Sequence, residues 1–76
     1  MENWRERLSS NANVCHGKVC VKGTRVMVAA VLANLADGEP VEEIMRMYNI
    51  QREDVMATIN YAAELAQERI VMAAGV

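Results

Sequence analysis

The chain has 76 residues, a formal net charge of −2 and an apolar content of 53%. The length predicts a single domain with a thin core, because a chain of this size buries only about 60% of its unfolded surface. Deep substrate clefts need more scaffold than this, so we expect a small binding module or subunit that is not an enzyme and has no cofactor. The apolar content and the low net charge exclude an intrinsically disordered chain.

Neither membrane insertion nor export is expected from this sequence. The longest uncharged run, residues 26–36, is shorter than the roughly 18 residues that a membrane span needs. Residues 1–7 contain no apolar run, so we expect no signal peptide. The prediction is a cytoplasmic protein with reduced thiols and no membrane partner.

Charge is distributed unevenly along the chain. Residues 1–25 carry five basic and two acidic residues, a balance of +3, whereas residues 26–76 carry three basic and eight acidic residues, a balance of −5. If any part of the chain contacts a phosphate backbone, the N-terminal third is therefore the better candidate.

This N-terminal third is expected to form an extended β-arm or a small hairpin. Residues 4–8 fit either a strand or a helical turn, and residues 9–13 read as a polar loop. Two short β-prone runs, residues 14–15 and 19–21, flank a glycine-containing turn. Gly23 then suits a positive φ that redirects the chain.

Helical periodicity begins at residue 26. The first helix has an apolar stripe, ends near Gly38, and is followed by Pro40 in the first turn of a short second helix. Glu42 and Glu43 favour the positive end of that second helix. The stripes of the two helices are Val28, Val31, Leu32 and Leu35, and then Val41, Ile44, Met45 and Tyr48.

A third and longest helix is predicted from about Arg52 onward, after a break at residues 49–51, with the acidic residues Glu53 and Asp54 in its first turn. A short helix, a tight turn and a longer helix are the outline of a helix-turn-helix. The expected buried stripe of the third helix is Val55, Ile59, Ala62, Ala66 and Ile70. The expected outward positions are Glu53, Ala57, Asn60, Glu64, Gln67 and Glu68.

Three segments of the chain resemble the domain-of-unknown-function family 433. The segment VCHGKVCVKGTRV at residues 14–26 is similar to the family's "hGkPcIkGTRI" signature, and LADGEPVEEI at residues 35–44 is similar to "LaaGesveEI". The segments REDV at 52–55 and YAAE at 61–64, with Ala57 and Ile59, resemble "treDvraAlaYAAe". The resemblance spans about residues 8–66, in order and in register.

The resemblance implies a homeodomain-like helix-turn-helix fold of three helices with a short N-terminal β-arm. It also implies a VapB-type antitoxin, which binds its operator DNA and masks a PIN-like ribonuclease toxin. The chain departs from the family pattern at Pro40, where Ser is usual and would form a capping box with Glu43. It also has Gln51 where Thr is common, which weakens the cap of the third helix.

A DNA interface would draw on two sets of residues. Lys18, Lys22 and Arg25 form a basic arm that could contact phosphates. Gln51 and Arg52 lie where a recognition helix meets base edges. The alternative for the arm is a solvated surface on which Arg25 pairs with Glu42 or Glu43. The acidic residues expected on the outward side of the third helix argue against strong DNA binding.

Two other groups of residues are candidate sites. Cys15, His16 and Cys20 supply only three of the four ligands that zinc usually needs, so we expect no metal and no catalytic pair there. A metal site, or a redox or disulfide role, remains the alternative to two small apolar thiols. A second apolar stripe on the third helix is the candidate surface for a homodimer or partner, formed by Met56, Tyr61, Leu65 and Met72.

Together these observations predict one domain over residues 1–76, with an arm at 1–25, a helical core at 26–66 and a helical tail at 67–76. The expected function is a small DNA-binding regulator resembling the antitoxin of a toxin–antitoxin pair. The alternative is a protein-interaction module that dimerises or masks a PIN-like toxin and binds little or no DNA.

Overall fold

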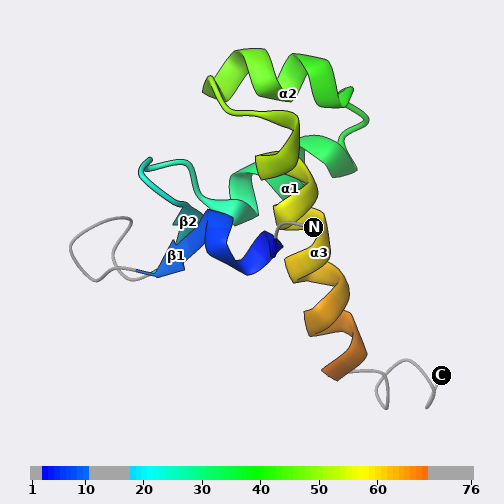
Figure 1. Cartoon of the computed structure of the whole chain (residues 1–76). Coiled ribbons are helices and arrows are strands. Elements are labelled where there is room, and N and C mark those ends of the chain that lie inside the picture. Colours follow the sequence, from blue (N-terminus) through cyan, green and yellow to red (C-terminus); the bar gives the residue numbers. More distant parts are fainter. Residues whose placement is uncertain (1–2, 11–17, 69–76) are drawn as a thin grey trace, which may run out of the picture.

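The computed structural model describes residues 3–10 and 18–68. A 3-10 helix, η1 (Trp4–Arg7), is followed by two strands, β1 (Leu8–Ser10) and β2 (Val19–Val21). Three helices complete the chain, α1 (Val28–Ala36), α2 (Val41–Tyr48) and α3 (Arg52–Glu68) (Figure 1). This confirms the predicted fold class, mostly helical with a short N-terminal hairpin. No helix in the described part of the chain is long and apolar enough to cross a membrane.

The hairpin pairs different segments from those expected. β1 and β2 are antiparallel, with Leu8 opposite Val21 and Ser10 opposite Val19. The polar loop predicted over residues 9–13 is therefore wrong for Ser9 and Ser10, and residues 14–15 lie outside the described residues. The pairing is favourable because it places Leu8 and Val21 together against the core.

A tight turn after β2 is held by Thr24. Its hydroxyl donates to the Val21 carbonyl over 2.7 Å, and its oxygen accepts from the Val26 N–H over 3.0 Å. Gly23 adopts φ +79° in this turn, a conformation that side chains disfavour. The predicted turn at Gly23 is thus confirmed.

Helix α1 ends at a glycine, as predicted. Gly38 has φ +92°, and its N–H donates to the Leu35 carbonyl over 3.0 Å. The Glu39 N–H reaches the Asn34 carbonyl over 3.1 Å, so two carbonyls of the last turn are satisfied in a Schellman motif. This compact stop leaves only four residues between the end of α1 and the start of α2.

Helix α2 lies across one end of the other two helices (Figure 1). Pro40 is its N-cap, one position before the predicted place, and makes no side-chain capping bond. Asn49 ends the helix in the left-handed conformation, with φ 55°. The stripes predicted for α1 and α2 are confirmed, because both contribute to a core formed by Val21, Val31, Ile44, Ile50 and Val55.

The buried stripe predicted for α3 is only partly correct. Val55 is fully buried, but Ile59 is 37% exposed and Ala66 is exposed. Ala57, predicted to point outward, is fully buried, and Thr58 is buried with it. The hydroxyl of Thr58 donates to the Val55 carbonyl over 2.7 Å, which satisfies its polar group inside the domain. The buried surface of α3 is thus rotated away from Ile59 and toward Ala57.

Candidate functional site

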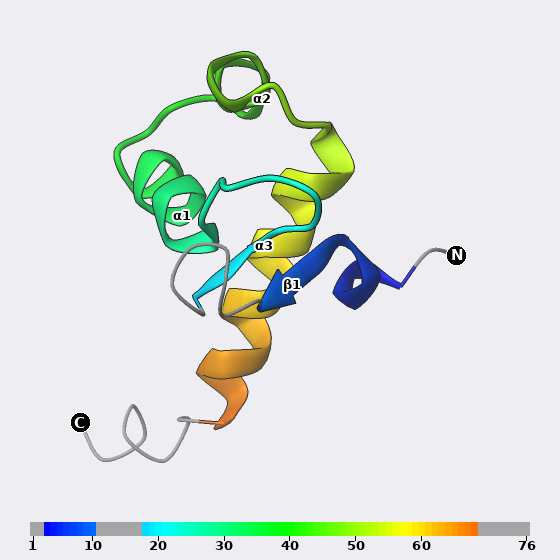
Figure 2. The same cartoon turned by 90° about the vertical axis from the view of Figure 1, so that its left-hand side faces the viewer.

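Ala57 lines a recess together with Trp4 and Arg7 of η1, a segment that lies beside α3 (Figure 2). Arg7 of η1 donates to one oxygen of the Asp54 carboxylate over 2.9 Å. The other oxygen accepts from the Gln51 N–H over 2.9 Å, so Asp54 both anchors η1 and caps the start of α3. Asp54 is only 9% exposed, and both of its oxygens are satisfied.

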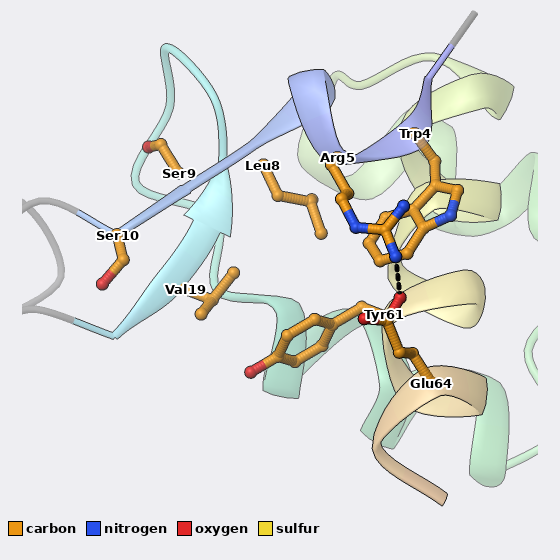
Figure 3. A pocket seen from close by; sticks show the side chains of 8 residues that line it. All are labelled: Trp4, Arg5, Leu8, Ser9, Ser10, Val19, Tyr61 and Glu64. Atoms are coloured by element: carbon orange, nitrogen blue, oxygen red, sulfur yellow. Dashed lines mark hydrogen bonds and ion pairs between the residues drawn. The ribbon is translucent and has the colours of Figure 1, made fainter. Parts of the chain in front are cut away.

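Farther along α3, η1 is held by Arg5 and Trp4. The Arg5 guanidinium lies 4.5 Å from the centre of the Trp4 ring and forms an ion pair with Glu64 (Figure 3). Together with Leu8, Val19 and Tyr61, these side chains line an open groove of about 270 Å³ between the hairpin and α3. We call the part of α3 that η1 contacts the η1 side; it carries Asp54, Ala57 and Glu64.

A different side of α3 is uncovered. Met56 is 45% exposed and Ile59 is 37% exposed, and Ala63 and Ala66 are exposed beyond them. These positions are spaced by three or four residues, so they form one stripe along the helix. We call this stripe the outer side of α3; it consists of Met56, Ile59, Ala63 and Ala66. It is longer and more apolar than a solvated helix face normally is.

The start of α3 offers little positive charge to a DNA groove. Gln51 and Arg52 are exposed there, as a recognition helix would require. Arg52, however, forms an ion pair with Glu42 of α2, and Glu53 follows it. The hydrogen bond from the backbone N–H of Glu42 and the interaction with Arg52 both lower the pKa of the Glu42 carboxyl. The Arg52 charge is therefore balanced within the molecule.

The structure does not bring all the candidate basic residues together. Lys18 lines a groove beside Tyr61 and Leu65, on the C-terminal half of α3. Lys22 and Arg25 are exposed in the turn that follows β2. Glu42 and Glu43, the expected partners of Arg25, form ion pairs with Arg52 and Arg46. The pair with Glu43 raises the pKa of Arg46, which therefore stays charged.

The candidate dimer residues are also separated. Tyr61 and Leu65 line the groove beside Met27 and Leu32 of the α1 region. Met56 lies in a different recess, with Trp4 and Asn60. Met56 and Leu65 are nine positions apart, which at about 100° per residue places them on opposite sides of the helix. Met56, Tyr61 and Leu65 therefore do not form one stripe, and Met72 lies outside the described residues.

The cysteine cluster can be described only in part. Cys20 is 1% exposed and disulfide-bonded, so the expected reduced thiol is wrong at this position. Cys15 and His16 lie outside the described residues. Among residues 3–10 and 18–68, no three His, Cys, Asp or Glu side chains converge as a metal site would require.

The sequence reasoning missed the role of η1. Residues 4–7 are too few to assign from pattern, and Asp54 was expected only as an acidic residue in the first turn of a helix. The available signal was the pair of arginines, Arg5 and Arg7, two residues apart in one short segment. Without the fold, nothing indicated that Asp54 and Glu64 would be their partners.

Comparison with known proteins gives a family but no activity. No curated protein and no solved structure matches the chain significantly. The model of the family described as "Protein of unknown function (DUF433)" matches residues 8–62, from the start of β1 into the second half of α3. The match leaves out η1, the element that covers the η1 side of α3. The chain belongs to the DUF433 family of proteins of unknown function.

Proposed function

We propose that the domain is a protein-interaction module that associates with a second copy of itself through the outer side of α3. The observation that carries the proposal is the apolar stripe of Met56, Ile59, Ala63 and Ala66. Water contacts this stripe in the single chain, and burying apolar surface contributes about 25 cal/mol per Å². A thin core gains from such burial, because association stabilises the folded chain.

The stripe is suited to an antiparallel pairing of two α3 helices. Its N-terminal half presents the larger side chains, Met56 and Ile59, and its C-terminal half presents the smaller ones, Ala63 and Ala66. A two-fold axis crossing the helix sets the large half of one copy against the small half of the other. Small residues also allow close approach of helix axes, which are about 8–10 Å apart in ordinary packing.

The test compares two methionines with the same exposure. Met56 on α3 and Met47 on α2 are each 45% exposed. We expect wild-type protein and the Met47→Glu variant to sediment as dimers at tens of micromolar, the order at which weak assemblies form. Met56→Glu places a charge in the interface and gives a monomer. A wild-type monomer, or a Met56→Glu dimer, contradicts the proposal.

A second candidate is a DNA-binding regulator of the antitoxin type. It is favoured by the three residues, 49–51, that connect α2 to α3, a spacing typical of a helix-turn-helix. Operator DNA and a PIN-like ribonuclease toxin would be its partners, as the family resemblance implies. The ion pair between Arg52 and Glu42 and the apolar outer side of α3 make this the less favoured candidate.

A titration with the DNA upstream of the gene tests this second candidate. Changing Lys18 and Lys22 together to Ala is expected to weaken binding to all sequences and to lower the salt slope by about one for each phosphate that is no longer neutralised. Gln51→Ala or Arg52→Ala is expected to relax sequence preference instead. No binding at low salt, where charges are least screened, rejects DNA binding.

A further inference from the structure

We propose that η1 is a releasable strap, held on α3 by its two arginines, that uncovers the η1 side of α3 while the helical core stays folded. The strap would regulate the helix through which the domain is proposed to associate, and so the inference rests in part on the proposed function. Its structural content, the release of η1, can be tested separately.

The first observation is that η1 has no buried residue of its own. Two ion pairs, Arg5–Glu64 and Arg7–Asp54, join it to α3, and the Arg7 carbonyl accepts from the Lys22 N–H over 2.8 Å where η1 runs into β1. The Arg5–Glu64 pair is open to water, with side chains 58% and 40% exposed, whereas the Arg7–Asp54 pair is more enclosed, at 21% and 13%. Exposed pairs hold weakly and weaken further with salt. Segments held in this way open locally before the whole domain unfolds.

The second observation is that the packing between η1 and α3 is incomplete. A recess of about 410 Å³ lies between Trp4 and Arg7 on one side and Arg52, Met56 and Asn60 on the other. The buried core cluster contains residues of β2 and of all three helices, but none of η1. Lifting η1 therefore leaves the central packing of Val31, Ile44 and Val55 in place.

The third observation is what the release uncovers. Ala57, fully buried under η1, is next to Met56 in the sequence and lines the same recess. Without η1, Ala57 would face water together with Met56, Glu53 and Asn60, which line the same recess. Asp54 would still accept from the Gln51 N–H, so the first turn of α3 would keep its cap.

The strap is expected to respond to ionic competition, because two charge pairs join it to α3 and the exposed Arg5–Glu64 pair is the more readily screened of the two. Raising the salt concentration from about 0.1 M to about 1 M shortens the screening length from about 10 Å to about 3 Å. An anionic partner that binds Arg5 and Arg7 would have the same effect on the two pairs. Release is therefore coupled to the charge of the surroundings.

The chain carries its own reporter of this release, since Trp4 in η1 is its single tryptophan. Acrylamide quenching of Trp4 fluorescence is measured on full-length protein at about 1 μM, below the range expected for dimerisation. High salt, or Glu64→Lys at low salt, is expected to raise the quenching constant about twofold because the pairs that hold η1 are screened or reversed. Far-UV circular dichroism is expected to stay unchanged.

The matched control is Glu39→Lys, which makes the same charge change at an exposed position between α1 and α2 and is expected to leave quenching at the wild-type value. A quenching constant that changes neither with salt nor with Glu64→Lys would contradict the proposal that η1 is releasable. A loss of helicity that accompanies the rise in quenching would also contradict it. Sedimentation of the same proteins separates the two proposals: a wild-type monomer with a releasable η1 rejects self-association alone, and a dimer with a fixed η1 rejects the strap alone.

Discussion

The η1 side and the outer side of α3 differ in what covers them more than in what they are made of. Ala57 and Ala66 are identical side chains on one helix, yet Ala57 is fully buried and Ala66 is exposed. Asp54 and Glu53 are neighbouring carboxylates, yet Asp54 is 9% exposed with two hydrogen bonds and Glu53 is exposed. The exposure of a residue of α3 therefore depends on whether η1 covers it, although η1 lies almost fifty residues away in the chain.

The largest difference in the free energy of unfolding is expected between substitutions of Asp54 and Glu53. Asp54→Ala removes the cap at Gln51 and leaves Arg7 without its carboxylate, so the free energy of unfolding should fall by about 2–4 kcal/mol. Glu53→Ala removes a carboxylate of the same first turn and should change it by less than about 0.5 kcal/mol. Urea unfolding of both variants checks this. Equal losses would show that the η1 side has no special stabilising contact.

The next largest difference in stability is expected between substitutions of Ala57 and Ala66. Ala57→Leu inserts bulk where η1 already covers the helix, which should cost about 1–3 kcal/mol. In a domain of this size that lowers Tm by at least about 4 °C. Ala66→Leu should change the stability of the single chain by less than about 0.5 kcal/mol. Thermal melts at low protein concentration compare the two, and a larger loss for Ala66→Leu would reverse the assignment of sides.

Breaking the enclosed ion pair of η1 should lower the free energy of unfolding more than breaking the exposed one. The difference between the two should be smaller than the differences above. Arg7→Ala breaks the enclosed pair with Asp54 and should cost about 1.5–3 kcal/mol. Arg5→Ala breaks an exposed pair and should cost less than about 1 kcal/mol. Denaturant titrations of the single variants measure both. A cost for Arg5→Ala that matches or exceeds that of Arg7→Ala would disagree with the exposures of the two pairs.

The smallest effect concerns Glu42, whose pKa is lowered in the folded chain from an ordinary value of 4.5. A lowered folded pKa means that its stabilisation is present above pH 4.5 and is lost as the pH falls through the folded value. Glu42→Gln should therefore melt slightly below wild type at neutral pH, with the gap closing under acid. A difference in melting temperature that grows as the pH falls would contradict the lowered pKa of Glu42.

Much of the fold was predictable because its determinants are local. The glycine stop at Gly38, the hydroxyl of Thr24 and the apolar stripes of α1 and α2 act within a few residues of chain. The errors on the hairpin and on α3 have a common cause in long-range contacts. Leu8 pairs with Val21, and Arg7 with Asp54, across stretches whose spacing no periodicity encodes.

The candidate site was predictable only as a set of residue types. Helical spacing indicated Met56 and Leu65 as apolar positions of the third helix, but grouped them on one stripe. The structure separates them because β2 and α1 border Leu65 while η1 borders Met56. Ile59 was expected in the core, and its 37% exposure is what extends the outer side beyond Met56.

Site-specific disulfide trapping tests the central claim, that the outer side of α3 is a contact surface between two copies. Ile59→Cys and Ala63→Cys chains are mixed and oxidised, and intact mass distinguishes the products, with Met47→Cys as the control. An antiparallel pairing brings position 59 of one copy to position 63 of the other, within the roughly 4.4–6.8 Å between Cα atoms that a disulfide needs. We predict a mixed Ile59→Cys/Ala63→Cys dimer as the main product and none from Met47→Cys. Trapping that is no greater at either α3 position than at Met47→Cys would contradict the account.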